Sequence, residues 1–188
     1  VVDGLGLKAL GLKLVNTDKS FETGLKKAGQ TLDLKTVPAE IRDPIRKKAK
    51  RQTTRMMDRY IDGRLGLVFD TTSADSSKIK FYKGMLDRLG YESKMVYVSA
   101  SLDNAQKRNS MRARKLPPEI VKKDWDRSQK NIDIMKKIFK KDFVQVTNDD
   151  DLSTLQKKTN SLFSKLMTWS TSFPNNKRSS LWKQRQVL

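Results

Sequence analysis

Short apolar runs alternate along the chain with longer segments whose apolar residues recur at helical spacing. Residues 12–15, 65–69, 95–98 and 143–146 are apolar runs bounded by polar or glycine residues, a pattern that predicts short strands. Strands that alternate with helices indicate an α/β fold, with one parallel sheet flanked by helices. We expect the second and third of these runs to lie in that sheet.

Segments whose apolar residues recur at helical spacing lie between and after these runs. The predicted helices cover residues 40–61, 76–89, 118–139 and 152–167. Apolar residues of the first helix fall at Ile41, Ile45, Ala49, Met56 and Tyr60. Residues 102–114 predict a helix that runs into a basic loop. The helix at 40–61 is expected to carry a strongly basic face.

The chain has 188 residues, which suits one principal domain. We expect an α/β domain over residues 1–149, a C-terminal helix over 150–168 and a basic tail over 169–188. The tail contains three aromatic side chains that suit docking against a partner, Trp169, Phe173 and Trp182.

Charge dominates the composition. Lys and Arg total 40 against 21 Asp and Glu, which gives a net charge of +19. An excess of this size favours a polyanionic partner such as DNA or RNA, or a larger assembly. The absence of Cys and His excludes disulfides, thiol nucleophiles and histidine-dependent triads or metal sites. No apolar run approaches the length of a membrane-spanning helix, so no membrane partner is expected.

The basic residues gather on one predicted helix and in one loop. Candidate nucleic-acid-binding residues on the helix at 40–61 are Arg46, Lys47, Lys50, Arg51 and Arg55. Arg114 and Lys115 in the loop complete the set. Aromatic side chains are scarce nearby, so contacts to the phosphate backbone are favoured over base stacking. A plain solvated helix face is the alternative interpretation.

Polar clusters stand at the ends of the predicted strands. Residues 15–18 (VNTD), 67–72 (LVFDTT), 89–95 (LGYESKM) and 107–112 (KRNSMR) follow one another along the chain. In this order and at these spacings they resemble P-loop kinases of the polynucleotide kinase and zeta toxin group. The resemblance covers roughly residues 12–146, and the segment 107–112 resembles the polynucleotide kinase lid.

The resemblance assigns roles to particular residues. It implies that Asp18 takes the proton from a substrate hydroxyl, and that Asp70 and Thr72 lie at the Mg²⁺ and phosphate site. Arg108 and Arg112 would neutralise charge on the phosphates of ATP, so ATP and Mg²⁺ are the implied cofactors. Each residue also has a structural alternative. Asp18 could instead be the N-cap of a helix starting near Lys19. Asp70 could be a turn residue, and the two arginines could be solvated surface charge.

Three features depart from the family pattern. The Walker A motif GxxxxGKS/T is absent, and the glycine-bearing residues 4–8 do not match it. We therefore expect the chain to start downstream of the first strand and the P-loop. Because that strand is central in the family's sheet, its absence would leave a gap. Phe21 stands where polynucleotide kinases carry a substrate-binding Arg, and Ala74 where zeta toxins carry an Arg.

Two functions are consistent with these observations. The first is ATP-dependent phosphoryl transfer to a hydroxyl of a nucleic acid or nucleotide sugar, with poor or no activity expected for residues 1–188 alone. The second is a non-catalytic, pseudokinase-like structural or assembly component of a phage particle, which contacts other virion proteins or DNA. The expected location is intracellular, in a host cytoplasm, or the virion in the second case.

Overall fold

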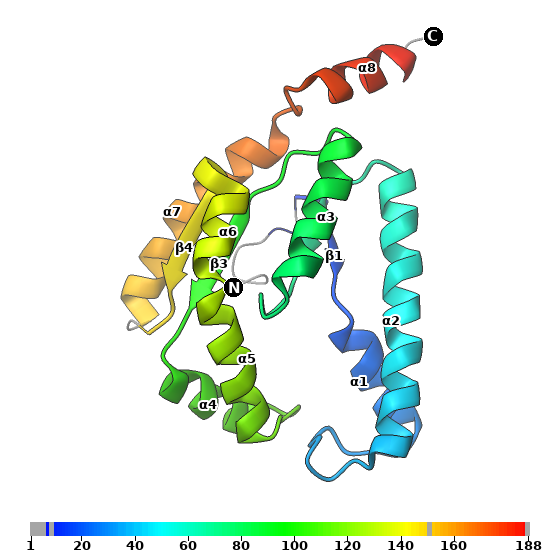
Figure 1. Ribbon diagram of the computed structural model, residues 1–188, viewed down its shortest axis with the longest axis vertical. Helices are drawn as coiled ribbons and strands as arrows, with labels where there is room; N and C mark the ends of the chain where they lie inside the picture. Colours follow the sequence, from blue (N-terminus) through cyan, green and yellow to red (C-terminus); the bar gives the residue numbers. More distant parts are fainter. Residues whose placement is uncertain (1–6, 8–9, 150–151, 187–188) are drawn as a thin grey trace. The chain divides into compact units, whose positions relative to one another are not determined.

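The computed structural model describes residues 7, 10–149 and 152–186 (Figure 1). Most of the glycine-bearing segment 4–8 therefore lies outside the described residues. The chain divides into two compact units. The first unit comprises residues 1–71 and 101–123, and the second comprises residues 72–100 and 124–188.

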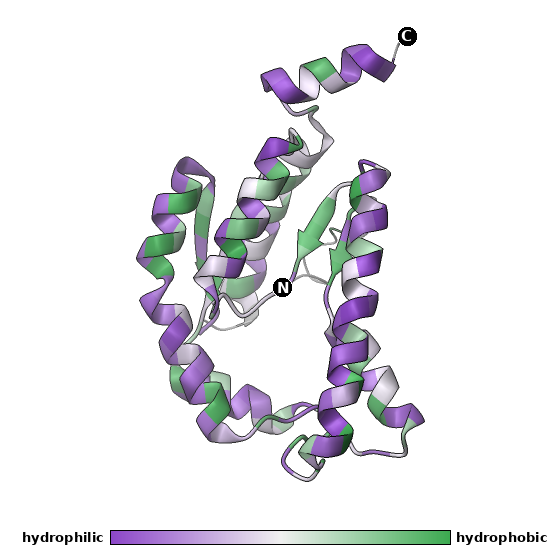
Figure 2. Cartoon of the chain, turned by 45° about the vertical axis from the view of Figure 1, so that its right-hand side comes forward, coloured by the Kyte–Doolittle hydropathy of each residue, from purple (hydrophilic) through white to green (hydrophobic). Residues whose placement is uncertain are grey.

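The first unit is built on two adjacent helices and a pair of strands. Its elements are β1 (Lys13–Val15), α1 (Asp18–Lys27), α2 (Ala39–Asp62), β2 (Leu67–Phe69), α4 (Leu102–Met111) and the start of α5 (Pro118–Lys130). β1 and β2 run parallel, with Leu14 opposite Val68. The two strands are apolar and α2 is largely hydrophilic, as the hydropathy colours of Figure 2 show.

The core of the first unit lies between α1, α2 and the loop that joins them. It consists of Phe21, Leu25, Leu34, Val37 and Ala49. α1 lies close against α2, because a Cβ on Gly24 would lie only 2.5 Å from Ile45 Cγ2. Phe21 is only 2% exposed, so the side chain at this position serves packing and not substrate binding.

The second unit contains the other strand pair and most of the remaining helices. Its elements are α3 (Ser76–Arg88), β3 (Met95–Ser99), the rest of α5, α6 (Ile132–Phe139), η1 (Lys140–Asp142), β4 (Phe143–Thr147), α7 (Leu152–Thr171) and α8 (Lys177–Gln186). β3 and β4 run parallel, with Tyr97 opposite Gln145. α6 packs against α3 and β4, and its Met135 is fully buried.

The α/β class, the parallel strand direction and the flanking helices are confirmed, but the expectation of one sheet for β2 and β3 is wrong. The structure pairs β1 with β2 and β3 with β4 in two separate two-stranded sheets. Each pair is closed by hydrogen bonds between its own two strands. No strand among the described residues joins the pairs.

The predicted helix over residues 118–139 is two helices. The interruption falls at Asn131, which is the N-cap of α6. The Asn131 side chain donates a hydrogen bond from Nδ2 to the carbonyl oxygen of Ser73 at 2.9 Å, a contact with a residue far away in the sequence. The C-terminal helix also runs further than expected, to Thr171.

The expected tail begins in the last turn of α7 and continues as α8, whose start contacts the end of α3 and the loop that follows it. Asn176 Nδ2 donates to the Gly90 carbonyl at 3.0 Å, and Arg178 donates to the Asp87 carbonyl at 2.8 Å. Ser179 is 6% exposed. None of the helices in the described parts of the chain is both long and apolar enough to cross a membrane.

Candidate active site

The carboxyl ends of β1 and β2 bring two acidic residues into one hydrogen-bonded group. Asp70 directly follows β2, and Asp18 begins α1 shortly after β1. Asn16 joins them, because its Nδ2 donates to Asp70 Oδ2 at 2.7 Å and its Oδ1 accepts from the Asp18 backbone N–H at 2.6 Å. The backbone N–H of Asp70 also donates to the Val15 carbonyl at 3.3 Å. Both acids therefore lie at the carboxyl ends of the β1–β2 pair, while the expected approach of Arg108 or Arg112 to them stays a prediction.

Asp18 is not the N-cap of α1. Thr17 holds that position and makes no side-chain capping hydrogen bond. The Asp18 carboxylate forms an ion pair with Arg114 instead, and its side chain is 48% exposed. It is therefore both oriented by a cation and open to a ligand.

Arg114 holds two carboxylates of α1 at once. Besides Asp18, it contacts Glu22, with 2.9 Å between Nε and Oε1. Asp18 and Glu22 are four residues apart and so lie on the same face of the helix. The Arg114 side chain is only 17% exposed. These three residues, with Asn16 and Asp70, are called the acidic site below.

The loop that carries Arg114 is itself fixed at several points. The Asn109 side chain forms two hydrogen bonds with the backbone of Leu116. Its Oδ1 accepts from the Leu116 N–H at 2.9 Å, and its Nδ2 donates to the Leu116 carbonyl at 2.8 Å. Lys115 pairs with Asp33 in a parallel bridge, and Leu116 packs against the core. Arg114 is thus presented to α1 by an anchored backbone.

The arginine that reaches Asp18 is therefore neither of the two predicted lid residues. Arg108 lies in the last turn of α4, and Arg112 is the exposed residue that ends this helix. Thr72 is exposed in the loop that follows β2. The roles predicted for these three residues stay predictions.

The described residues contain no group of three acidic side chains that could hold a metal ion by themselves. Asp70 is exposed and offers carboxylate oxygens, which Mg²⁺ prefers. A metal ion here would therefore draw most of its ligands from phosphate groups and water.

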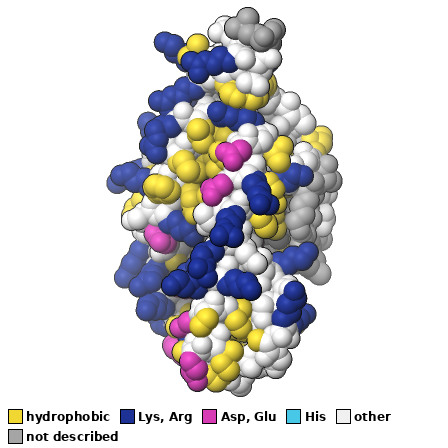
Figure 3. All heavy atoms as spheres, turned by 90° about the vertical axis from the view of Figure 1, so that its right-hand side faces the viewer, with side chains coloured by type: hydrophobic (Ala, Val, Ile, Leu, Met, Phe, Trp, Pro, Cys, Tyr) yellow, Lys and Arg dark blue, Asp and Glu magenta, His cyan; other side chains and the backbone are white. Residues whose placement is uncertain are grey.

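The basic face of α2 is solvent-exposed. Its five predicted nucleic-acid-binding residues are all exposed: Arg46, Lys47, Lys50, Arg51 and Arg55. Figure 3, which faces the side of the chain that carries α2, shows many more Lys and Arg than Asp and Glu side chains. Arg46 also lies over the Phe21 ring, 5.4 Å from its centroid. Arg114 belongs to the acidic site, and Lys115 is half-buried in the bridge; their predicted contact with nucleic acid is untested.

The aromatic residues near the C-terminus lie in different surroundings. Lys94 lies over the half-buried Trp169, 5.3 Å from the ring. Phe173 is 47% exposed and lies under Lys183, while Trp182 is half-buried. Docking of these side chains against another chain stays a prediction.

Sequence reasoning missed two members of the acidic site and misplaced a third. Glu22 has a usable signal, its i, i+4 spacing from Asp18. Asn16 lies in a strand-end cluster, but nothing local indicates that it links the Asp70 carboxylate to the Asp18 backbone N–H. Arg114 stands 96 residues from Asp18, so its partner follows only from the tertiary fold.

Comparison with known proteins gives one match. A family model described as zeta toxin matches residues 31–161, more than half of the chain. The matched range includes Asp70 and Arg114 and begins after α1, so Asp18 lies outside it. No curated protein and no solved structure matches the chain.

Proposed function

The chain belongs to the zeta toxin family, a P-loop kinase-like family, and from this premise we propose that it serves phosphoryl transfer from ATP to a hydroxyl group. The acceptor class is a nucleic acid or a nucleotide sugar. The observation that carries the proposal is the Asn16 bridge, which holds Asp18 and Asp70 together at the carboxyl edge of β1 and β2.

The acidic site suits the acceptor side of such a reaction. Phosphoryl transfer depends on positioning and charge stabilisation more than on covalent chemistry. Asp18 accepts the proton of the acceptor hydroxyl. Arg114 orients the Asp18 carboxylate, and Asn16 holds the Asp18 backbone. Asp70 and Thr72 lie on the side toward the phosphates. Arg108 and Arg112 reach the phosphate groups from α4.

ATP supplies the transferred group, and Mg²⁺ would neutralise charge on its phosphates when bound. The residues present fit only part of that requirement. Asp70 offers oxygen ligands, whereas residues 1–188 contain no GxxxxGKS/T motif whose backbone amides and lysine would cradle the phosphates. We therefore expect residues 1–188 alone to turn over ATP poorly or not at all.

The experiment is a label-transfer assay with the full product of the gene that encodes these residues, run in parallel with residues 1–188 alone. γ-Labelled ATP and Mg²⁺ are supplied with a 5′-hydroxyl oligonucleotide or a UDP-sugar as acceptor. The proposal expects label on one acceptor class from the gene product. Absence of transfer to both classes would contradict it, and robust turnover by residues 1–188 alone would contradict the expected dependence on a phosphate loop.

A second candidate is a non-catalytic component of a phage particle. The net charge of +19 favours it. It expects DNA binding without label transfer and burial of Trp182 in an assembly. Removal of residues 170–188 would then abolish incorporation into particles and leave any label transfer unaffected.

A further inference from the structure

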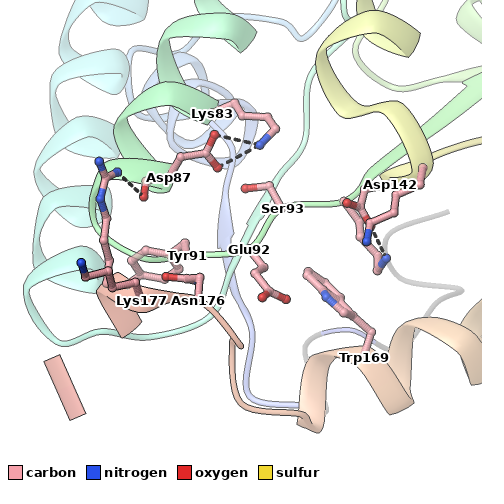
Figure 4. Close-up of a pocket in the computed structure, with 12 residues that line it drawn as sticks. Lys83, Asp87, Tyr91, Glu92, Ser93, Asp142, Trp169, Asn176 and Lys177 are labelled. Atoms are coloured by element: carbon pink, nitrogen blue, oxygen red, sulfur yellow. Dashed lines mark hydrogen bonds and ion pairs between the residues drawn. The ribbon is translucent and has the colours of Figure 1, made fainter. Parts of the chain in front are cut away.

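A pocket of about 770 Å³ lies in the second unit, at the opposite ends of the strands from those used by parallel-sheet active sites. Lys94 immediately precedes β3 and Asp142 immediately precedes β4, and both line the pocket. The remaining wall comes from α3, the α3–β3 loop, α7, and the start of α8 with the residue before it (Figure 4). The pocket is distinct from the acidic site, whose residues all belong to the first unit.

The acidic side chains of this pocket are already engaged. Asp87 pairs with Lys83 at 2.8 Å, and Asp142 pairs with Lys94 at 2.6 Å. Glu92 accepts the backbone N–H of Asn175 at 2.9 Å. Asp87 and Asp142 are therefore paired with cations, whereas Glu92 accepts from a neutral N–H.

Three cations of the pocket have no carboxylate partner among the described residues. Lys141 and Lys177 are exposed and form no ion pair there, and Arg178 donates only to the Asp87 carbonyl. They come from two segments, the turn before β4 and the first turn of α8. The lining holds five cations against three carboxylates, so the pocket carries an excess of positive charge that an anion would neutralise.

Trp169 supplies an aromatic wall to the same pocket. Figure 4 shows its indole ring projecting from α7 into the pocket, beside Glu92 and on the same side as Asp142. Lys94 lies 5.3 Å from the ring centroid. An indole beside several cations is a suitable arrangement for a ligand that combines a flat ring with phosphate.

The α8 part of the wall depends on one close backbone approach. Gly90 has a φ of +86°, and a Cβ there would lie 2.9 Å from Ser179 N and 3.2 Å from Arg178 C. Only glycine lets the start of α8 sit against the α3–β3 loop, and that contact places Lys177 and Arg178 at the pocket.

We propose that this pocket binds a mononucleotide, with the base against Trp169 and the phosphate held by the cations of the wall that pair with no described carboxylate, which are Lys141, Lys177 and Arg178. Its volume lies within the range of small-molecule sites, roughly 300–1,000 Å³. The inference goes beyond the proposed phosphoryl transfer and does not depend on it.

The test is calorimetric titration of residues 1–188 with AMP at low salt, with ribose 5-phosphate and adenosine as the two halves of the ligand. AMP is expected to bind more tightly than either half. Trp169→Ala should weaken AMP binding about 5- to 150-fold, the range that corresponds to the loss of one base–aromatic stack. Trp169→Phe should retain most of the affinity, and it separates loss of stacking from loss of folding.

Two further pairs of variants locate the phosphate. Lys141→Ala with Lys177→Ala should weaken binding about tenfold or more, whereas Lys157→Ala with Lys165→Ala, which removes two exposed charges of α7 outside the pocket, should not. Gly90→Ala should weaken binding by displacing α8. Gly29→Ala is its control, because Gly29 has a φ of +67° and no atom within 4 Å of an added Cβ.

The proposal is overturned if AMP shows no binding at millimolar concentration. It is equally overturned if the two lysine pairs weaken binding alike, since AMP would then respond to net charge alone. AMP affinity unchanged in both Trp169→Ala and Gly90→Ala would also overturn it.

Discussion

At the scale of single residues, Arg114 is the side chain that organises the acidic site. It is largely buried and contacts both Asp18 and Glu22. Arg114→Met keeps the aliphatic bulk and removes the charge, so the two carboxylates of α1 face each other without a cation. We expect the free energy of unfolding to fall by about 1–2 kcal/mol, the scale of a charge-assisted hydrogen bond in a partly exposed pair.

The control for this substitution is Arg112→Met, two residues away in the same loop. Arg112 is exposed, so its removal should change stability by less than about 0.5 kcal/mol. Urea unfolding followed by circular dichroism measures both variants. Equal losses would mean that Arg114 contributes only as surface charge.

At the scale of elements, the contact between α1 and α2 is set by Gly24. An added Cβ would lie 2.5 Å from Ile45 Cγ2, and Ile45 is a β-branched residue with few alternative rotamers. Gly24→Ala should therefore destabilise the protein by about 1–2 kcal/mol, the lower part of the range for overpacking, despite the better helix propensity of alanine.

Gly84 in α3 provides the matched comparison. An added Cβ there would meet only Arg88 Nη1, at 3.7 Å, so Gly84→Ala should stabilise the protein by about 0.5–1 kcal/mol. Thermal unfolding of the two variants should show shifts of opposite sign. A gain in both would show that α1 and α2 are less closely packed than described.

Local patterns predicted most elements correctly. The runs at 12–15, 95–98 and 143–146 form strands, and Gly63 caps α2 close to the expected end. These features depend on burial patterns and turn residues that lie close together in the sequence. Within α2, the sequence pattern placed Met56 on the apolar face, whereas Met57 is buried and Met56 is 36% exposed. α2 packs against both α1 and β1, so a single helical stripe does not describe its buried face.

Features that depend on distant partners were not predictable in the same way. The break between α5 and α6 accompanies a side-chain contact from Asn131 to Ser73. The partnership of Arg114 with Asp18 requires the loop anchored by Asn109 and Leu116. In each case the deciding contact joins segments that no local pattern relates, while the positions of Asp18 and Asp70 followed directly from the strand ends.

At the scale of the whole molecule, the charge of +19 governs the expected response to salt. Binding of duplex DNA through phosphates should weaken steeply as salt rises, by about 0.9 in the log–log slope for each phosphate neutralised. Lys50→Ala with Arg51→Ala, on the exposed face of α2, should lower that slope by about 1–2. Fluorescence anisotropy across a salt series measures it.

The control again uses Lys157→Ala with Lys165→Ala, which removes the same charge from α7. If both pairs reduce the slope equally, DNA contacts the protein without a preferred face. If neither changes it, the basic face of α2 is only a solvated surface.

The central claim is that Asp18 accepts the acceptor proton, and Asp18→Asn in the full gene product tests it most directly when transfer and binding are measured separately. Loss of a general base typically costs about 10²–10⁴ in rate, so label transfer should fall by that factor while the dissociation constant for the acceptor changes little. Asp133→Asn, on an exposed carboxylate of α6, should leave both unchanged. Transfer by Asp18→Asn at the wild-type rate would contradict the claim.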